Sequence, residues 1–230
     1  MNVSSFKCVF GSLFVFSLAV QGFCITKSCS ALDTESVVEH LNSVGAKKLH
    51  VKDGRLSYVN LRDSQVTDED VEPVRDFESI VFLSLQGTRV TDGVGETVGK
   101  LKNLEWLLLG KTNVGDAFVK QLSDLKSLKT LSLEGSRITD EAVKKFAKLP
   151  QLRTVNLAGT KVTSAAIDSL KQMRSLTSLD VSETALNADD IQQLLTIRSL
   201  REISVSPEQF LDDQAAFVAE SFPSVQIQVK

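Results

Sequence analysis

Apolar residues recur every 24 positions between residues 56 and 205, without insertion or deletion. The first, fourth and sixth positions of each unit are aliphatic throughout this stretch. The first-position residues are Leu56, Ile80, Leu104, Leu128, Leu152, Leu176 and Leu200. Self-similarity at a fixed period is the signature of a repeat protein, because one unit alone cannot bury its apolar edge and must stack on its neighbours.

Each unit predicts a short strand, a turn and a short helix. The fourth and sixth positions alternate with polar or variable neighbours, as the inward-facing residues of a strand do. The eighth position is glycine in three units, and the twelfth is mostly threonine followed by aspartate, a pattern typical of a helix N-terminus. Apolar residues three apart, such as Val143, Phe146 and Leu149, then predict the buried side of a helix. We expect a parallel sheet covered by helices.

Both ends of the array predict caps, which solenoids need to cover their terminal units. Residues 32–44 predict a helix that buries Val37, Leu41 and Val44 and ends at Gly45, followed by a hairpin with its turn at Asp53 and Gly54. The register breaks at Ser206 and Pro207. Beyond it, Phe210, Phe217, Val218 and Phe222 predict a closing helix, and residues 225–229 alternate like a last strand that shields the sheet edge.

The repeat motif resembles the leucine-rich repeat family, whose pattern is L-x-x-L-x-L-x-x-N/C-x-L. Residues 128–138 read LKTLSLEGSRI and residues 152–162 read LRTVNLAGTKV. The units are closest to the cysteine-containing subclass, with threonine or serine at the ninth position. The resemblance implies an α/β right-handed solenoid, or horseshoe, with a parallel concave sheet and helices on the convex side. We expect each ninth-position hydroxyl to donate to a carbonyl of the adjacent turn.

The N-terminus has the pattern of a secretory signal peptide. Lys7 precedes an uncharged stretch at residues 8–26, and small residues allow cleavage after Gly22 or after Ala31. An uncleaved membrane anchor is the alternative. Cys8, Cys24 and Cys29, the chain's three cysteines, all lie here. Cys24 and Cys29 could pair if both survive cleavage. These features predict a secreted, periplasmic or cell-envelope protein with no stable membrane insertion once the leader is cleaved.

The domain division that follows assigns residues 1–22 to the signal peptide and 23–55 to an N-terminal linker with a capping helix and hairpin. Residues 56–205 form the array, with six full units and a partial seventh, and residues 206–230 form the C-terminal cap.

Composition and motifs argue against nucleic-acid binding and against catalysis. The formal net charge is −3, whereas nucleic-acid binders usually carry a basic surplus. The two histidines, His40 and His50, lie in the N-terminal cap, and the sequence contains no glycine-rich phosphate loop, zinc-type spacing or nucleophile elbow. Acidic pairs such as Asp189 and Asp190 are explained by predicted helix starts. We therefore expect no enzyme activity, no cofactor and no metal.

The candidate binding site is a row of aromatic residues on the outward face of the sheet. Tyr58, Phe82 and Trp106 occupy the third position of consecutive units, and Leu108 extends the row at the fifth position. Neighbouring strands lie about 4.8 Å apart, so these side chains are expected to form one strip. Such a strip predicts a protein or peptide partner on the concave face. Two alternatives remain: the cap covers the rings as core, or the strip is a self-association contact of a structural envelope component.

Overall fold

The computed structural model describes residues 33–209 and 221–230. The expected signal peptide, the cysteines and the expected closing helix around Phe210 and Phe217 lie outside the described residues. Among the helices within the described ranges, none has the length and hydrophobicity required to span a membrane.

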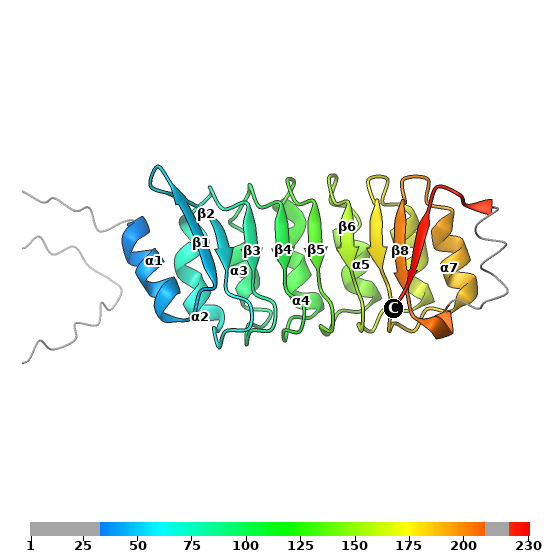
Figure 1. Cartoon of the computed structure of the whole chain (residues 1–230), viewed down its shortest axis with the longest axis horizontal. Helices are drawn as coiled ribbons and strands as arrows, with labels where there is room; N and C mark the ends of the chain where they lie inside the picture. The colour runs from blue at the N-terminus through cyan, green and yellow to red at the C-terminus, as the bar shows by residue number, and fades with distance from the viewer. Residues whose placement is uncertain (1–32, 210–220) are drawn as a thin grey trace, which may run out of the picture. The chain divides into compact units, whose positions relative to one another are not determined.

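In this part of the chain, nine strands form one open sheet in chain order (Figure 1). They are β1 (Lys48–Lys52), β2 (Arg55–Asn60), β3 (Phe82–Ser84), β4 (Trp106–Leu108), β5 (Thr130–Ser132), β6 (Thr154–Asn156), β7 (Ser178–Asp180), β8 (Glu202–Val205) and β9 (Gln226–Val229). β1 pairs antiparallel with β2, and all later neighbours pair in parallel. From β2 to β8 each residue pairs with the residue 24 positions later, as Leu83 does with Leu107. The sequence period is therefore the register of the sheet.

The helices lie behind this sheet and cover one of its faces (Figure 1). The α-helices are α1 (Thr34–Ser43), α2 (Asp68–Val71), α3 (Val94–Val98), α4 (Asp116–Val119), α5 (Asp140–Phe146), α6 (Ile167–Lys171) and α7 (Ala188–Leu195). Short 3₁₀ segments accompany them: η1 (Glu72–Asp76), η2 (Lys120–Asp124), η3 (Ser164–Ala166) and η4 (Pro207–Gln209). The predicted alternation of strand and helix is confirmed.

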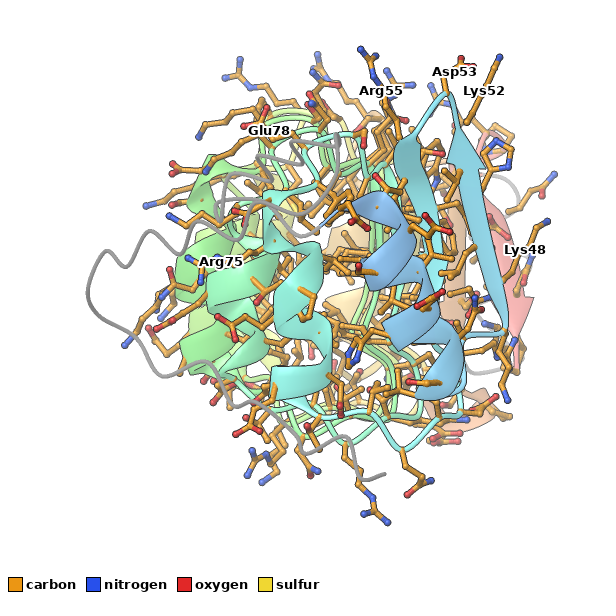
Figure 2. The ribbon with its side chains drawn as sticks, turned by 90° about the vertical axis from the view of Figure 1, so that its left-hand side faces the viewer. Lys48, Lys52, Asp53, Arg55, Arg75 and Glu78 are labelled. Atoms are coloured by element: carbon orange, nitrogen blue, oxygen red, sulfur yellow. The ribbon has the colours of Figure 1, made fainter. Side chains whose placement is uncertain are left out.

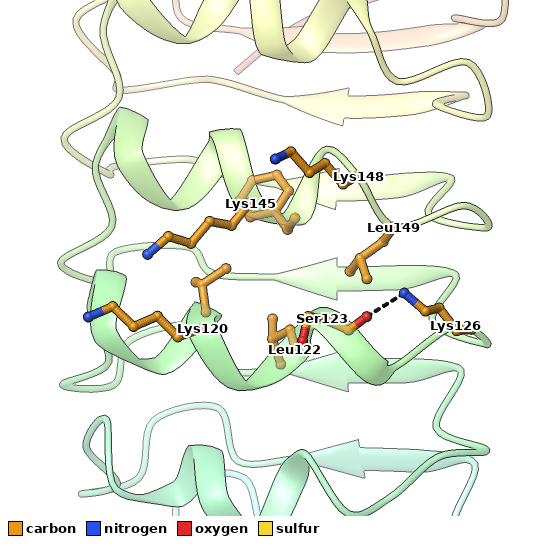
Figure 3. Close-up of a pocket in the computed structure, with 9 residues that line it drawn as sticks. Lys120, Leu122, Ser123, Lys126, Lys145, Lys148 and Leu149 are labelled. Atoms are coloured by element: carbon orange, nitrogen blue, oxygen red, sulfur yellow. Dashed lines mark hydrogen bonds between the residues drawn. The ribbon is translucent and has the colours of Figure 1, made fainter.

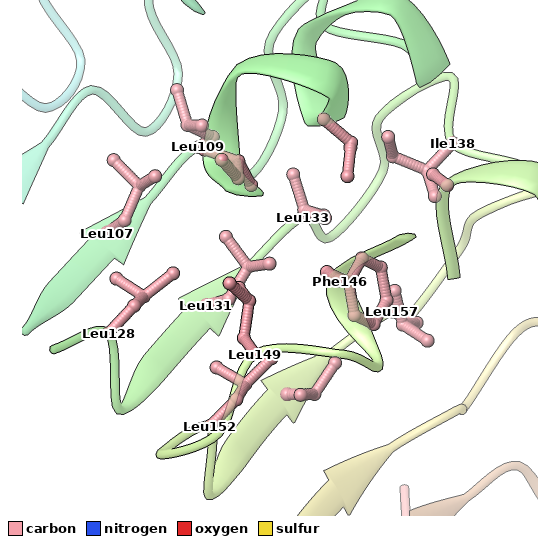
Figure 4. Packing of buried hydrophobic residues seen from close by; sticks show 14 of the residues in the cluster. Leu107, Leu109, Leu128, Leu131, Leu133, Ile138, Phe146, Leu149, Leu152 and Leu157 are labelled. Carbon is pink, nitrogen blue, oxygen red and sulfur yellow. The ribbon is translucent and has the colours of Figure 1, made fainter. Parts of the chain in front are cut away.

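The core lies between the sheet and the helices (Figure 4). Leu83, Leu107 and Leu131, all at the fourth position, have no exposed surface. On the helix side, Val143 and Phe146 of α5 are equally buried. The inward assignment of the fourth position is thus confirmed, and the fold is the predicted α/β solenoid with a parallel sheet on one side and helices on the other.

The turn after each of the six strands β2 to β7 uses a left-handed residue at the eighth position of the unit. Three of these residues are Gly87, Gly135 and Gly159, with φ of 70°, 61° and 63°. The other three are Asp63, Lys111 and Glu183, with φ of 55°, 56° and 56°. An L-residue pays a steric penalty in this region that glycine does not. The backbone requirement of the stack therefore overrides local preference in three of the six turns.

The ninth-position hydroxyl groups form a repeated hydrogen bond, which lies within each unit and does not link neighbouring units. Ser64, Thr88, Thr112, Ser136, Thr160 and Thr184 each donate to the carbonyl oxygen three residues earlier, at 2.6 Å. The expectation that they reach the adjacent turn is wrong. The left-handed eighth residue turns the chain back, so the hydroxyl meets the sixth-position carbonyl of its own strand.

In addition to the backbone bonds of the sheet, aspartates at the thirteenth position form side-chain bonds between units. Asp116 accepts from the backbone N–H of Thr139 at 2.9 Å and from its hydroxyl at 2.6 Å. Asp140 makes the same two bonds to Thr163, at 2.8 and 2.7 Å. These two acids at helix starts thus also hold the next unit, a role that the sequence pattern alone did not reveal.

A helix and a hairpin precede the array. Asp33 accepts from the backbone N–H of Ser36 at 2.8 Å, Leu41 is fully buried, and Gly45 has φ of 97°. The hairpin turn has Asp53 and Gly54 in left-handed conformations. Figure 2 shows the charged residues Lys52, Asp53 and Arg55 at the tip of this hairpin. Lys48, at the start of β1, lies on the opposite side of this view from Arg75. At the other end, β9 pairs in parallel with β8.

Candidate functional site

The register of the sheet places the predicted site residues side by side. Tyr58 pairs with Phe82, and Phe82 pairs with Trp106, on three consecutive strands. Leu108 follows Trp106 by two residues on β4, so both side chains leave the same face of the sheet. We call Tyr58, Phe82, Trp106 and Leu108 the aromatic strip.

The rings of the strip are held by stacking and by two lysines. Tyr58 and Phe82 lie parallel, with centroids 4.1 Å apart and planes inclined by 6°. The Nζ atom of Lys48 lies 5.6 Å from the centre of the Tyr58 ring, and that of Lys129 lies 5.8 Å from the Trp106 ring. Both distances allow a cation–π attraction. The sequence prediction of the site did not include these lysines, although Lys129 directly precedes the strand residue that pairs with Trp106.

The strip is open to solvent at Trp106. This side chain is 38% exposed, and the other three members of the strip are half-buried. Among the described residues, Val51 and Val229 are the other large apolar side chains that are similarly exposed, and both lie on edge strands. Trp106 is thus unusual, because it exposes an indole ring in the interior of the sheet, where the edge effect does not account for it.

Beyond the strip the same face becomes polar, and two of its acids accept hydrogen bonds from neighbouring hydroxyl groups. Asp180 on β7 accepts from the backbone N–H and the hydroxyl of Ser182, at 3.1 and 2.7 Å, and forms an ion pair with Lys230. Glu202 on β8 accepts from the Ser178 hydroxyl at 3.1 Å. This region contains no large apolar residue as exposed as Trp106 among the residues described, so the exposed apolar surface in the interior of the sheet lies at the strip.

Residues with catalytic or metal-binding chemistry do not gather at this face. Within residues 33–209 and 221–230, no group of three or more His, Cys, Asp or Glu side chains is close enough to hold a metal ion. His40 is occupied by a contact between its Nε2 atom and the carbonyl of Asp70, at 2.9 Å. His50 is exposed on β1. What the site offers is therefore apolar contact area and aromatic faces, flanked by two ammonium groups.

Comparison with known proteins supports the architecture. A family model described as leucine-rich repeat region matches residues 12–227. The structure of an internalin C2 from Listeria monocytogenes is similar, with a TM-score of 0.61 and 23% sequence identity, over 76% of this chain and 71% of that chain. A second internalin from the same organism gives a TM-score of 0.46 at 15% identity, over 75% of this chain and 60% of that chain. No curated protein matches the sequence.

Proposed function

This chain belongs to the leucine-rich repeat family, and on that premise we propose that it is a non-catalytic scaffold that binds a protein or peptide partner through the aromatic strip. The observation that carries the proposal is the exposed indole of Trp106 in the interior of the sheet. Large aromatic side chains surrounded by better-buried neighbours dominate the energetics of protein interfaces. Here Phe82 and Leu108 are those neighbours.

The strip is also rigid before any partner arrives. Hydrogen bonds on both sides fix β3 and β4 in the sheet, and the Tyr58 ring stacks on Phe82. Association therefore orders few new side chains, which lowers its entropic cost. Lys129 lies over the Trp106 ring and also pairs with Glu105 at 2.8 Å. A partner that covers the indole either displaces this ammonium group or includes it at the rim.

The test compares two exposed apolar residues, only one of which belongs to the strip. A partner captured with the full chain is titrated against Trp106→Ala and against Val51→Ala, which truncates an exposed residue of β1. We expect Trp106→Ala to weaken binding by at least about 1 kcal/mol, or about fivefold. Val51→Ala should leave the affinity unchanged. Equal affinities for the two variants would remove the strip from the interface.

A second candidate function is a structural envelope component that self-associates. It is favoured by the two edge strands of the sheet in the described part of the chain, where Val51 on β1 is 41% exposed and Val229 on β9 is 52% exposed. Unprotected edge strands can pair with another chain. Sedimentation velocity at several protein concentrations separates the candidates. A concentration-dependent mass that Val51→Lys abolishes would favour self-association through β1, whereas a monomer at all concentrations would favour the scaffold.

We also propose that the protein is exported, on the strength of the signal-peptide pattern at residues 1–22 and the cysteine-free array. N-terminal sequencing of the secreted or envelope fraction tests this directly. A mature chain beginning at Phe23 or Leu32 is expected, and one that retains Met1 would support the uncleaved anchor.

A further inference from the structure

A groove on the helix side of the molecule combines an apolar floor with a positively charged rim. It has a volume of about 310 Å³ and lies between η2, which follows α4, and α5. Leu122 and Leu149 are among the residues that line it, and both are nearly fully buried. Lys120, Lys126, Lys145 and Lys148 surround them (Figure 3). We call these six residues the lysine groove.

The four ammonium groups of the lysine groove are not neutralised. In the described part of the chain, none of them lies within ion-pair distance of a carboxylate. Lys126 donates to the carbonyl oxygen of Ser123 at 2.6 Å, and this contact supplies no counter-charge.

Two of the acids that are close in sequence pair with lysines outside the groove. Asp124 of η2 pairs with Lys102 at 3.2 Å, and Glu141 of α5 pairs with Lys144 at 2.6 Å. The hydrogen bond that Lys144 donates to the Glu141 carboxylate raises the pKa of Lys144, which is the expected result of a close carboxylate. The groove thus has four positive charges, whereas the carboxylates of Asp124 and Glu141 form ion pairs with other lysines.

We propose that the lysine groove binds an acidic segment of a partner protein. One apolar side chain of that segment covers Leu122 and Leu149, and carboxylates on either side of it meet the surrounding ammonium groups. In Figure 3 the amines of Lys120 and Lys145 lie on the left and that of Lys126 on the right, with both leucines between them. Charges placed around a hollow fit a chain that enters it, whereas a membrane surface would favour charges on an open plane.

This inference stands apart from the proposed function, because the lysine groove is built by the helices and the aromatic strip by the sheet. The probe is a fluorescent synthetic peptide with sequence DEEFEED, titrated with the full chain and followed by anisotropy. The groove variant carries Lys120→Gln together with Lys145→Gln. The matched control carries Lys52→Gln together with Lys161→Gln, two exposed lysines on β1 and on the turn after β6, and changes the net charge equally.

We expect the groove variant to weaken peptide binding about three- to tenfold, as the loss of two partly screened charge pairs implies. The control should bind nearly as the natural protein does. A peptide with serine in place of phenylalanine should also bind more weakly, because it leaves the apolar floor uncovered.

Three outcomes would overturn the proposal. Equal losses in the groove variant and the control would reduce the effect to overall charge. Equal binding of the phenylalanine and serine peptides would remove the apolar floor from recognition. Failure of the natural protein to bind the peptide would exclude an acidic segment, and cosedimentation with phosphatidylserine vesicles in that case would assign the lysines to a membrane surface.

Discussion

The aspartate bonds between neighbouring units give the sharpest test of how the solenoid is held together. Asp116 starts α4, so two accounts predict that it stabilises the fold. In the first, its charge favours the positive end of the helix dipole. In the second, its carboxylate ties Thr139 of the next unit through two hydrogen bonds of 2.9 and 2.6 Å. Replacing the residue by alanine removes both effects, so a matched control is needed.

The magnitudes of the two accounts differ. A hydrogen bond to a charged group contributes roughly 1.5–3 kcal/mol, and an acid near a helix N-terminus roughly 0.3–1 kcal/mol. Asp116 and Thr139 are only half-buried, so water compensates part of the loss. We therefore expect Asp116→Ala to lower the free energy of unfolding by about 2 kcal/mol, or about 4–8 °C in melting temperature. Asp116→Asn keeps one acceptor oxygen and should lose about half as much.

Asp168 provides the control, because it is an exposed acid in the first turn of α6 with no side-chain partner among the described residues. Asp168→Ala should cost about 0.5 kcal/mol, the dipole contribution alone. Urea unfolding followed by far-ultraviolet circular dichroism measures the set, and a double-mutant cycle with Thr139→Ala isolates the pair. Equal destabilisation by Asp116→Ala and Asp168→Ala, with no coupling to Thr139, would refute the role in joining units.

Two further predictions concern the core and the turns. Leu131→Ala opens a cavity at a fully buried position and should cost about 2–5 kcal/mol in the same unfolding assay, so an unchanged transition would contradict the core assignment. Gly135→Ala places a side chain at φ of 61° and should cost about 1 kcal/mol, whereas Lys111→Gly relieves the same conformation and should stabilise by about 0.5 kcal/mol. Melting temperatures that move in one direction for both turn variants would show that the left-handed requirement does not hold.

The fold could be predicted from the sequence because the 24-residue period determines the register of the strands in the sheet. An uninterrupted 24-residue spacing means that equal positions in consecutive units pair, as Leu83, Leu107 and Leu131 do. The left-handed conformation of Lys111 was harder to predict, because lysine is not a typical turn residue. It follows only from the fact that Lys111 occupies the same position of the unit as Gly87 and Gly135. The ninth-position ladder was predicted with the wrong acceptor, since the path of the turn is a property of dihedral angles.

The same distinction applies to the two surfaces. Adjacency of Tyr58, Phe82 and Trp106 follows from the period, whereas Lys48 lies on β1, outside the repeat and next to an irregular register at His50 and Val51. The position of the Lys48 ammonium group over the Tyr58 ring could therefore not be predicted from the repeat pattern. The lysine groove was hidden for a related reason. Its four lysines occupy four different positions of the unit, and they meet only because helical and 3₁₀ segments bring them together.

A solenoid allows one unit to serve both surfaces without compromise. Trp106 and Lys120 belong to the same 24-residue unit, yet one projects from the sheet and the other from the helix side. Leu107 and Leu109 lie between them and have no exposed surface. Stability constrains these inward positions, whereas the outward positions on either side contribute little to the core. Residues on each surface can therefore be substituted independently, because the buried leucines between the surfaces provide the packing that holds neighbouring units together.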